Sequence, residues 1–152
     1  MRRLVAAVVL AAGVAGAGPG HAAVARRDLG RDESRGGHTL ARHVGRTDDE
    51  LRARLRRETR IAAASTFEDR ATAEEVVAAT LGAERDRVRE WSRREPPRPN
   101  LALDYRGGRP IGRSLRRGRS RVELCRDAVV VLKWRSGDPD FFVLTAYPEV
   151  RH

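Results

Sequence analysis

The sequence predicts one α+β domain, with helices in its first half and strands in its second half. Two observations support this class. Two helix-capping motifs precede Pro96 and Pro97, and the segments with alternating or continuous apolar residues follow these prolines. Helices and strands that are segregated along the chain in this way are typical of the α+β class. A chain of 152 residues has room for one domain of this kind.

Three helices are expected before the prolines. The first is short and covers residues 39–44, where apolar side chains share one face. The second begins at a capping box in residues 47–50 and runs to about Glu58. A second capping box in residues 72–75 opens a longer helix, which continues through Trp91 and ends before the prolines.

Four strands are expected after the prolines, at residues 101–105, 121–125, 128–134 and 141–147. The third is apolar enough for a central strand, and Pro148 ends the fourth. Residues 106–120 are rich in glycine and arginine and are predicted to form a mobile loop. Because Cys125 is the only cysteine, no disulfide can form within the chain, and the hydrophobic core alone must stabilise the fold.

The N-terminal residues predict export. Residues 1–25 have the pattern of a cleaved signal peptide: two arginines, an apolar run too short to span a membrane, and small residues at the cleavage site. Residues 26–36 are polar and glycine-rich and are predicted to be a flexible leader, and residues 37–152 form the domain. The expected product is a secreted protein with no stable membrane insertion after cleavage.

The net charge predicts a polyanionic partner. The formal charge is +10, and loss of the export segment with its two arginines leaves about +8. A field of this sign favours nucleic acid, an anionic membrane or an acidic protein. Lys133 is the only lysine, so arginine carries nearly all the positive charge. Genome composition can produce the same bias, and charge alone does not establish the partner.

The last strand has the most decidable geometry, because side chains alternate between the two faces of a strand. A regular strand places Phe142, Leu144 and Ala146 on an apolar core face. The opposite face then ends in two neighbouring hydroxyls, Thr145 and Tyr147. Such a pair can donate hydrogen bonds to a phosphate, although threonine and tyrosine are also ordinary strand residues.

Two histidines and one arginine in the early helices are candidates for chemistry. A histidine with its usual pKa near 6.5 suits general acid–base catalysis. His38 and His43 are five residues apart, so they would point about 140° apart on one helix, and His38 is expected near the helix start. Arg54 lies at the edge of a buried helix face, with a guanidinium that can reach toward the sheet. For each of them, an ordinary surface position is the alternative.

The glycine-rich loop carries the densest basic tract, and it can contact phosphate backbones without sequence preference. A solvated loop is the alternative interpretation. The candidate RNA-binding residues of this loop are Arg106, Arg109, Arg113, Arg116 and Arg117. The sequence contains no CxxC or HExxH motif, no phosphate-binding glycine loop and no carboxylate-rich cluster, so neither a metal nor another cofactor is expected.

Four blocks of the sequence resemble the bacterial ribonuclease A-like toxin domain, which is found at the C-terminal ends of contact-dependent growth inhibition and related polymorphic toxins. The blocks are GGHTLARHVGRTDDELRARL (36–55), ASTFEDRATAE (64–74), LALDYRGGRPIGRSLRRG (101–118) and FFVLTAYPE (141–149). They follow the order of the family and span nearly the whole chain after the export segment. The first and last blocks are the specific ones.

The resemblance implies a ribonuclease A-like fold, in which N-terminal helices pack on a curved antiparallel sheet without disulfides. It also implies an active site drawn from the early helices and the last strand. The family's histidine falls on His43, its arginine on Arg54, and its threonine and tyrosine on Thr145 and Tyr147. His38 lies in the same opening motif and either assists catalysis or is structural.

The implied activity is metal-independent cleavage of RNA. His43 would remove the proton of the 2′-hydroxyl, and Arg54 would stabilise the charge that develops on the phosphoryl oxygens. Thr145 or Tyr147 would hydrogen-bond the phosphate or assist protonation of the 5′-oxygen, for which His38 is the alternative donor. The product would be a 2′,3′-cyclic phosphate, and DNA would not be cut.

The implied partners are an RNA substrate and, for a toxin, an acidic immunity protein that neutralises it; a monomer is expected. Family members usually form the end of a large delivery protein, whereas this domain follows an export signal almost directly, so a free secreted ribonuclease is also open. Two other functions remain: a non-catalytic basic module that binds RNA or another polyanion, and a structural domain that keeps the fold without the activity.

Overall fold

The computed structural model of the protein describes residues 26–137 and 140–151. Within these residues the chain forms five helices, α1 (Leu29–Glu33), α2 (Thr39–His43), α3 (Asp48–Arg57), α4 (Arg70–Ala83) and α5 (Arg85–Ser92). The same residues form six strands, β1 (Ala63–Phe67), β2 (Leu101–Tyr105), β3 (Gly112–Arg116), β4 (Glu123–Cys125), β5 (Asp127–Trp134) and β6 (Phe141–Glu149). The predicted signal peptide lies outside the described residues.

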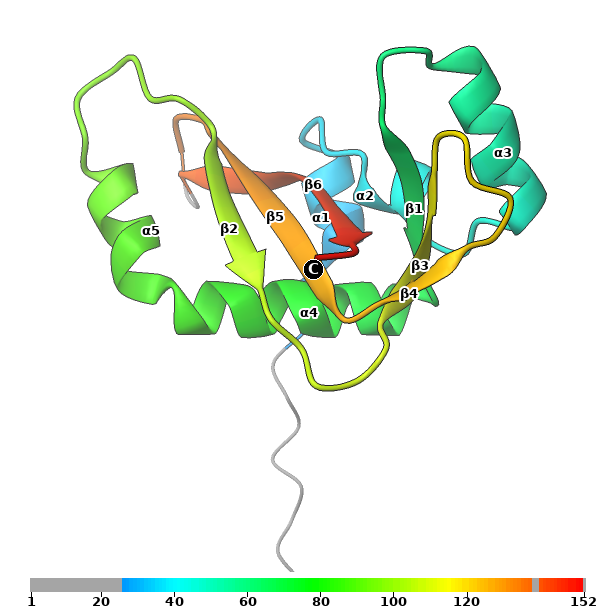
Figure 1. The fold of residues 1–152 in the computed structure, drawn as a ribbon. Helices are drawn as coiled ribbons and strands as arrows, with labels where there is room; N and C mark the ends of the chain where they lie inside the picture. The colour runs from blue at the N-terminus through cyan, green and yellow to red at the C-terminus, as the bar shows by residue number, and fades with distance from the viewer. Residues whose placement is uncertain (1–25, 138–139, 152) are drawn as a thin grey trace, which may run out of the picture.

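The strands form two antiparallel sheets of three strands each, with the orders β1-β3-β4 and β2-β5-β6. The sheets stand as two arms, and α4 runs along the base of both (Figure 1). α3 packs on β1 and β3, while α1 and α2 pack on β6. Helices that flank antiparallel sheets confirm the predicted α+β class.

The two sheets meet where the end of β6 passes β3. A side chain at Gly112 would meet the Thr66 carbonyl oxygen at 2.2 Å and the Pro148 ring at 2.9 Å, so only glycine fits at this contact. The close approach brings the C-terminal half of β6 against the other sheet. The side chains of β6 next to this contact, Thr145, Tyr147 and Glu149, line the space between the sheets.

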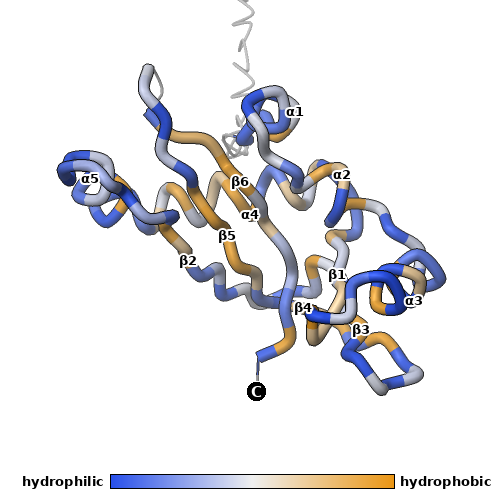
Figure 2. The backbone as a smooth tube through the Cα atoms, turned by 90° about the horizontal axis from the view of Figure 1, so that it is seen from above, coloured by the Kyte–Doolittle hydropathy of each residue, from blue (hydrophilic) through white to orange (hydrophobic). Residues whose placement is uncertain are grey.

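One large hydrophobic core joins α1, α4, α5 and both sheets, and a smaller one lies under α3. Apolar residues concentrate along β5 and β6, between the helices (Figure 2). The smaller core consists of Leu51, Leu55, Ala64 and Leu115, so the predicted inward face of the second helix is confirmed. Within residues 26–137 and 140–151, no helix is both long and apolar enough to cross a membrane.

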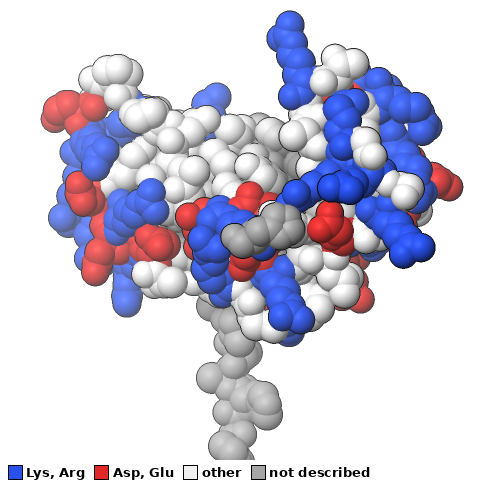
Figure 3. Space-filling view, in the orientation of Figure 1, with Lys and Arg blue, Asp and Glu red and all other residues white. Residues whose placement is uncertain are grey.

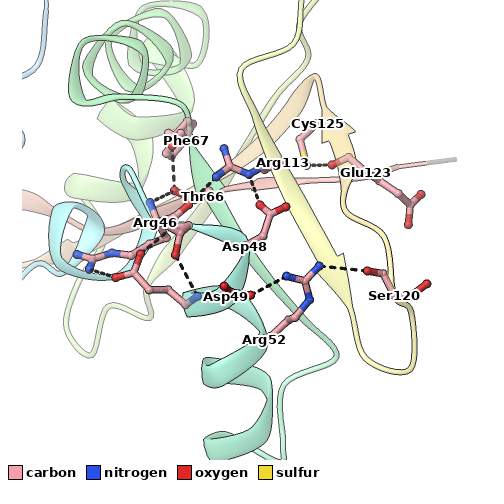
Figure 4. A network of polar contacts seen from close by, with 12 residues as sticks. Arg46, Asp48, Asp49, Arg52, Thr66, Phe67, Arg113, Ser120, Glu123 and Cys125 are labelled. Carbon is pink, nitrogen blue, oxygen red and sulfur yellow. Dashed lines mark hydrogen bonds and ion pairs between the residues drawn. The ribbon is translucent and has the colours of Figure 1, made fainter.

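A polar network fixes the start of α3 to its sheet (Figure 4). Arg113 on β3 donates to the Asp48 carboxylate at 2.6 Å and to the Arg46 carbonyl oxygen at 2.8 Å. The Arg46 amide donates in turn to the Thr66 hydroxyl on β1 at 2.9 Å. The predicted capping box is present, with the Thr47 side chain accepting from the N3 amide. These contacts hold α3 at a fixed place beside the space between the sheets.

The predicted flexible leader is wrong, because residues 29–33 form α1. Asp28 caps this helix, and Leu29 lies fully buried in the main core. Asp32 is buried as well and accepts hydrogen bonds from the Arg27 guanidinium and from the Val143 amide of β6. The polar composition of the segment gave no sign of this helix, whose buried Asp32 accepts a hydrogen bond from β6.

Several predicted boundaries in the middle of the chain are also corrected. α4 begins at Arg70, because the Asp69 side chain accepts from the Thr72 amide and caps the helix earlier than the predicted box. The predicted long helix breaks at Glu84 into α4 and α5. The strand β1 was not expected, and β3 occupies part of the predicted mobile loop because it pairs with β1 and β4.

A β-bulge in β6 changes the predicted faces of that strand. Val131 pairs with Thr145 and Leu132 pairs with Val143, so Leu144 has no partner on β5. The extra residue puts Val143 on the buried side together with Ala146 and moves Leu144 out of the predicted core face. Pro148 does not end the strand, which continues to Glu149. Thr145 and Tyr147 still share one face, as predicted.

Candidate active site

The five candidate catalytic residues line one open cleft between the two sheets, with a volume of about 510 Å³. α2 and its N-cap supply His43 and His38, α3 supplies Arg54, and β6 supplies Thr145 and Tyr147. Residues that are far apart in the sequence are therefore gathered by the crossing of β6 and the attachment of α3. β1 and β3 form the remaining wall.

His43 is the most buried of these groups, with an exposed fraction of 7%. Its Nδ1 lies 3.2 Å from the Ser65 carbonyl oxygen, and a carbonyl can only accept, so Nδ1 carries the proton. The neutral ring then leaves Nε2 free to accept a proton. Burial, reinforced by the nearby Arg54 charge, lowers the pKa of His43 from 6.5 to about 3. The imidazole is therefore neutral at physiological pH, the form that a general base requires.

His38 reaches the same cleft because it is not part of the helix. It is the N-cap of α2 with a non-helical backbone, so the 140° separation that a continuous helix would impose does not apply. Its amide donates to the Leu144 carbonyl oxygen at 2.9 Å, and this bond ties it to the bulge of β6. His38 is only half-buried; burial, together with the Arg42 charge, lowers its pKa from the usual value.

Arg54 projects from α3 with a side chain that is only 15% exposed. Its Nε donates to the Glu58 carboxylate at 3.2 Å, and its Nη1 donates to the Arg42 carbonyl oxygen at 3.4 Å. Among the described residues no hydrogen bond engages Nη2, which leaves its donors for a ligand in the cleft. The fork is oriented before any ligand arrives, as an anion-binding arginine requires.

The bulge of β6 aims the two hydroxyl side chains at the cleft. The Thr39 hydroxyl accepts from the Ala146 amide at 2.9 Å, so α2 holds the strand on both sides of Thr145. The Thr145 hydroxyl oxygen is buried and has no hydrogen-bond partner among the described residues. The Tyr147 ring lies beside the His43 ring, with a centroid separation of 5.5 Å. An unpartnered buried hydroxyl in a cleft wall is a ready hydrogen-bonding group for a substrate.

Two buried serines that sequence reasoning missed also line the cleft. Ser65 on β1 and Ser114 on β3 are direct cross-strand partners. Ser65 additionally supplies the carbonyl that holds His43. The segment around Ser65 is short and weakly apolar, so no strand was expected there, and no sequence signal placed its backbone beside His43.

The five loop arginines do not form one surface. Arg106 pairs with Asp127, Arg109 with Glu75 on α4, and Arg113 with Asp48. The Arg117 guanidinium donates to backbone carbonyl oxygens of the segment that follows α3. Of the five, Arg116 alone lines the cleft. The structure thus separates residues that sequence proximity had grouped.

The cleft combines a neutral imidazole, a second imidazole, arginine charge and two hydroxyls. Within residues 26–137 and 140–151, no group of three or more His, Cys, Asp or Glu side chains is placed to hold a metal ion. Arg54 and Arg116 supply positive charge to the cleft, and Glu149 is an acid at its edge. Such a site can bind an anion, remove one proton and return another.

Comparisons with known proteins show the family to which the chain is similar. The family model described as the bacterial CdiA-CT RNAse A domain matches residues 37–148, which include all five candidate catalytic residues. A chain in the crystal structure of a CdiA-CT/CdiI complex from Y. kristensenii 33638 is similar with a TM-score of 0.68 and 30% sequence identity. The match covers 75% of this chain and 100% of that chain. No curated protein matches the sequence.

Proposed function

Because the chain belongs to the bacterial CdiA-CT RNAse A domain family, we propose that it is a secreted, metal-independent endoribonuclease that acts as an antibacterial toxin. The observation that carries this proposal is the single cleft that holds His38, His43, Arg54, Thr145 and Tyr147. RNA is the substrate that such a site suits, because it brings both a phosphate and its own nucleophile, the adjacent 2′-hydroxyl.

In the proposed mechanism, His43 is the general base. Its Nε2 accepts the proton of the 2′-hydroxyl while Nδ1–H stays on the Ser65 carbonyl, which keeps the ring in the required tautomer. The oxygen then attacks the adjacent phosphorus, and the bond to the 5′-oxygen breaks. The product is a 2′,3′-cyclic phosphate.

Arg54 stabilises the negative charge on the phosphoryl oxygens, a preorganised contribution typically worth about 3 kcal/mol. Thr145 and Tyr147 donate hydrogen bonds to the same phosphate. The Tyr147 ring lies against His43, on the side of the base. We assign the general acid to His38, which lines the cleft from the other end of α2 and is the more exposed imidazole.

The proposed partner other than RNA is an immunity protein. The similar solved chain was crystallised in a complex with CdiI. A basic toxin of this family is best neutralised by an acidic protein that is complementary in charge. We propose that this chain is a monomer that binds such a protein in the cell that makes it.

Cleavage of RNA by the purified protein in the presence of EDTA tests the proposal. The wild type should cut RNA and leave DNA of the same sequence intact. His43→Ala and Tyr147→Phe should each lower the rate at least tenfold, because they remove the base and a phosphate contact. Tyr105→Phe is the matched control, since Tyr105 lies on β2 and does not line the cleft.

Other outcomes of this assay favour other functions. RNA binding without cleavage would favour a non-catalytic module, for which the net positive charge is the supporting observation. The absence of both binding and cleavage would favour a structural domain. Cleavage that survives both substitutions would refute the assigned site and leave the enzyme class standing.

A further inference from the structure

A second basic surface lies next to the cleft and is not used by the proposed chemistry. It covers one side of α3 and the turn between β3 and β4, and we refer to it as the hairpin surface. In Figure 3, basic side chains gather over these elements, whereas basic and acidic side chains are mixed over α5. The hairpin surface consists of Arg52, Arg56, Arg116, Arg117, Arg119 and Arg121.

Few carboxylates offset this charge. Arg52 pairs with the exposed Asp49, and Arg116 lies 3.8 Å from Glu123. Arg56, Arg119 and Arg121 form no ion pair with any described residue, and all three are exposed. On α5, by contrast, Arg87 and Arg89 each pair with a nearby acid, and so does Arg94 just after the helix.

The hairpin surface is held in place by bonds that leave its charge intact. Arg117 donates to the carbonyl oxygens of Ile61 at 3.1 Å and Glu58 at 2.8 Å. Arg52 donates to the Ser120 carbonyl oxygen at 3.3 Å and thereby ties α3 to the turn (Figure 4). Neutral carbonyls orient both guanidinium groups; Arg117 keeps its charge unpaired by any described carboxylate, whereas Arg52 also pairs with Asp49. The turn itself is closed by Gly118, whose φ of 80° favours glycine.

The surface and the cleft are continuous. Arg116 lines the cleft and also lines the two shallow grooves that run over the turn. One of these grooves is lined by Arg119, Ser120, Arg121 and the acid Glu123, and the other extends to Arg52 and Arg56 on α3. A chain that leaves the cleft past Arg116 therefore meets unpaired arginines on either path.

We propose that the hairpin surface is a second phosphate-binding site, which takes the RNA backbone on one side of the cleaved bond. The proposal rests on the proposed ribonuclease function and extends it from one phosphate to several. Arginine forks bind phosphate oxygens of any nucleotide, so the site adds affinity without base preference. It predicts that long RNA is a better substrate than a dinucleotide.

The variant Arg119→Gln/Arg121→Gln tests this site, because both side chains are exposed and neither forms a hydrogen bond or ion pair with a described residue. Affinity is measured with a single-stranded DNA oligonucleotide of about 20 nucleotides, which has the phosphates but no 2′-hydroxyl. We expect about tenfold weaker binding and a salt dependence whose slope falls by about 1.4, for two lost phosphate contacts at about 0.7 each. Cleavage of a dinucleotide should be unchanged.

The matched control is Arg87→Gln/Arg89→Gln, which removes the same charge from α5 and should leave oligonucleotide affinity within about twofold. Equal affinities of the hairpin variant and this control would overturn the second site. A parallel loss of dinucleotide cleavage in the hairpin variant would overturn it too, because the substitutions would then act on the cleft. If the wild type cuts no RNA while the hairpin variant still loses affinity, the phosphate site stands and the ribonuclease proposal falls.

Discussion

His43 shows how one buried side chain links stability to chemistry. The same burial that keeps its imidazole neutral for catalysis makes protonation costly for the fold. Its folded pKa, about 3, lies below the unfolded value of 6.5. Above pH 6.5 the ring is neutral in both states. As the pH falls below 6.5, His43 binds a proton in the unfolded chain but not in the folded chain. The free energy of unfolding therefore decreases until the pH reaches about 3.

The first prediction is therefore a difference in acid sensitivity between the wild type and His43→Gln. Between pH 7.5 and pH 5, the wild type should lose about 2 kcal/mol more of its free energy of unfolding than the variant. Urea unfolding at several pH values measures the difference. The same pH dependence in both proteins would show that the imidazole is not buried in its neutral form.

His38 carries the second prediction at this scale. Burial and the Arg42 charge lower the pKa of His38, and its protonated form, which the leaving group needs, becomes more abundant as the pH falls. The value of kcat/KM should thus rise as the pH is lowered from 8 toward 6. His38→Ala should lower kcat about a hundredfold or more and flatten this rise. If His38→Ala keeps the same rise of kcat/KM at lower pH, Tyr147 rather than His38 would be the general acid.

At the scale of elements, α1 and the bulge of β6 act together. The buried Asp32 carboxylate accepts a hydrogen bond from the Val143 amide at 3.1 Å and two more from Nε and Nη2 of Arg27. Asp32 thus holds the outer edge of β6, opposite the edge that pairs with β5. α1 precedes the residues matched by the family model, yet it holds the strand that presents Thr145.

The third prediction concerns this clamp. Asp32→Ala should cost about 2–4 kcal/mol of stability, because it strands a buried amide and separates a largely buried ion pair. Asp32→Asn keeps an acceptor for Val143 and should cost less. Thermal unfolding measures both, and kcat/KM should fall further for alanine than for asparagine. Equally small losses of stability and kcat/KM in both variants would mean that Asp32 and α1 do not hold β6 in place.

Elements with strong local signals could be predicted from the sequence. The capping box at Thr47 and the alternation in residues 101–105 gave α3 and β2 nearly as observed. β1 and β3 could not be predicted, because their short, weakly apolar sequences form strands through pairing with each other. The bulge at Leu144 is likewise set by partners on α1 and α2, whereas a sequence pattern assumes strict alternation.

The same limit applies to the site. The resemblance to a family identified His43, Arg54, Thr145 and Tyr147, and the structure brings them to one cleft. Periodicity alone separated His38 from His43, because it applied the angle of one continuous helix to a residue that precedes the helix. The sequence analysis grouped five loop arginines by their charge density, whereas ion pairs with distant acids separate Arg106, Arg109 and Arg113 from the other two. Contacts between distant parts of the chain determine the position of each of these side chains.

At the scale of the whole molecule, the fold depends on its core rather than on a covalent link. Cys125 is the only cysteine and is fully buried at the end of β4. Burial raises the pKa of its thiol to about 12, so the reactive thiolate is scarce in the folded protein.

The fourth prediction follows from this burial. A thiol reagent at neutral pH should modify Cys125 slowly in the native protein and rapidly in urea. The rate of modification then reports opening of the sheet that contains β3 and β4. Rapid modification of the native protein would show that this sheet opens without unfolding of the rest.

If the cleft cuts RNA by attack of the RNA 2′-hydroxyl on the adjacent phosphorus, the chemical identity of the product reveals it. A dinucleotide substrate is incubated with the purified protein in EDTA, and the phosphorus is followed by NMR. We expect a 2′,3′-cyclic phosphate from the wild type, and none with His43→Ala or when the 2′-hydroxyl is removed from the substrate. A linear phosphate formed without a cyclic intermediate, or cleavage of the deoxy substrate, would contradict it.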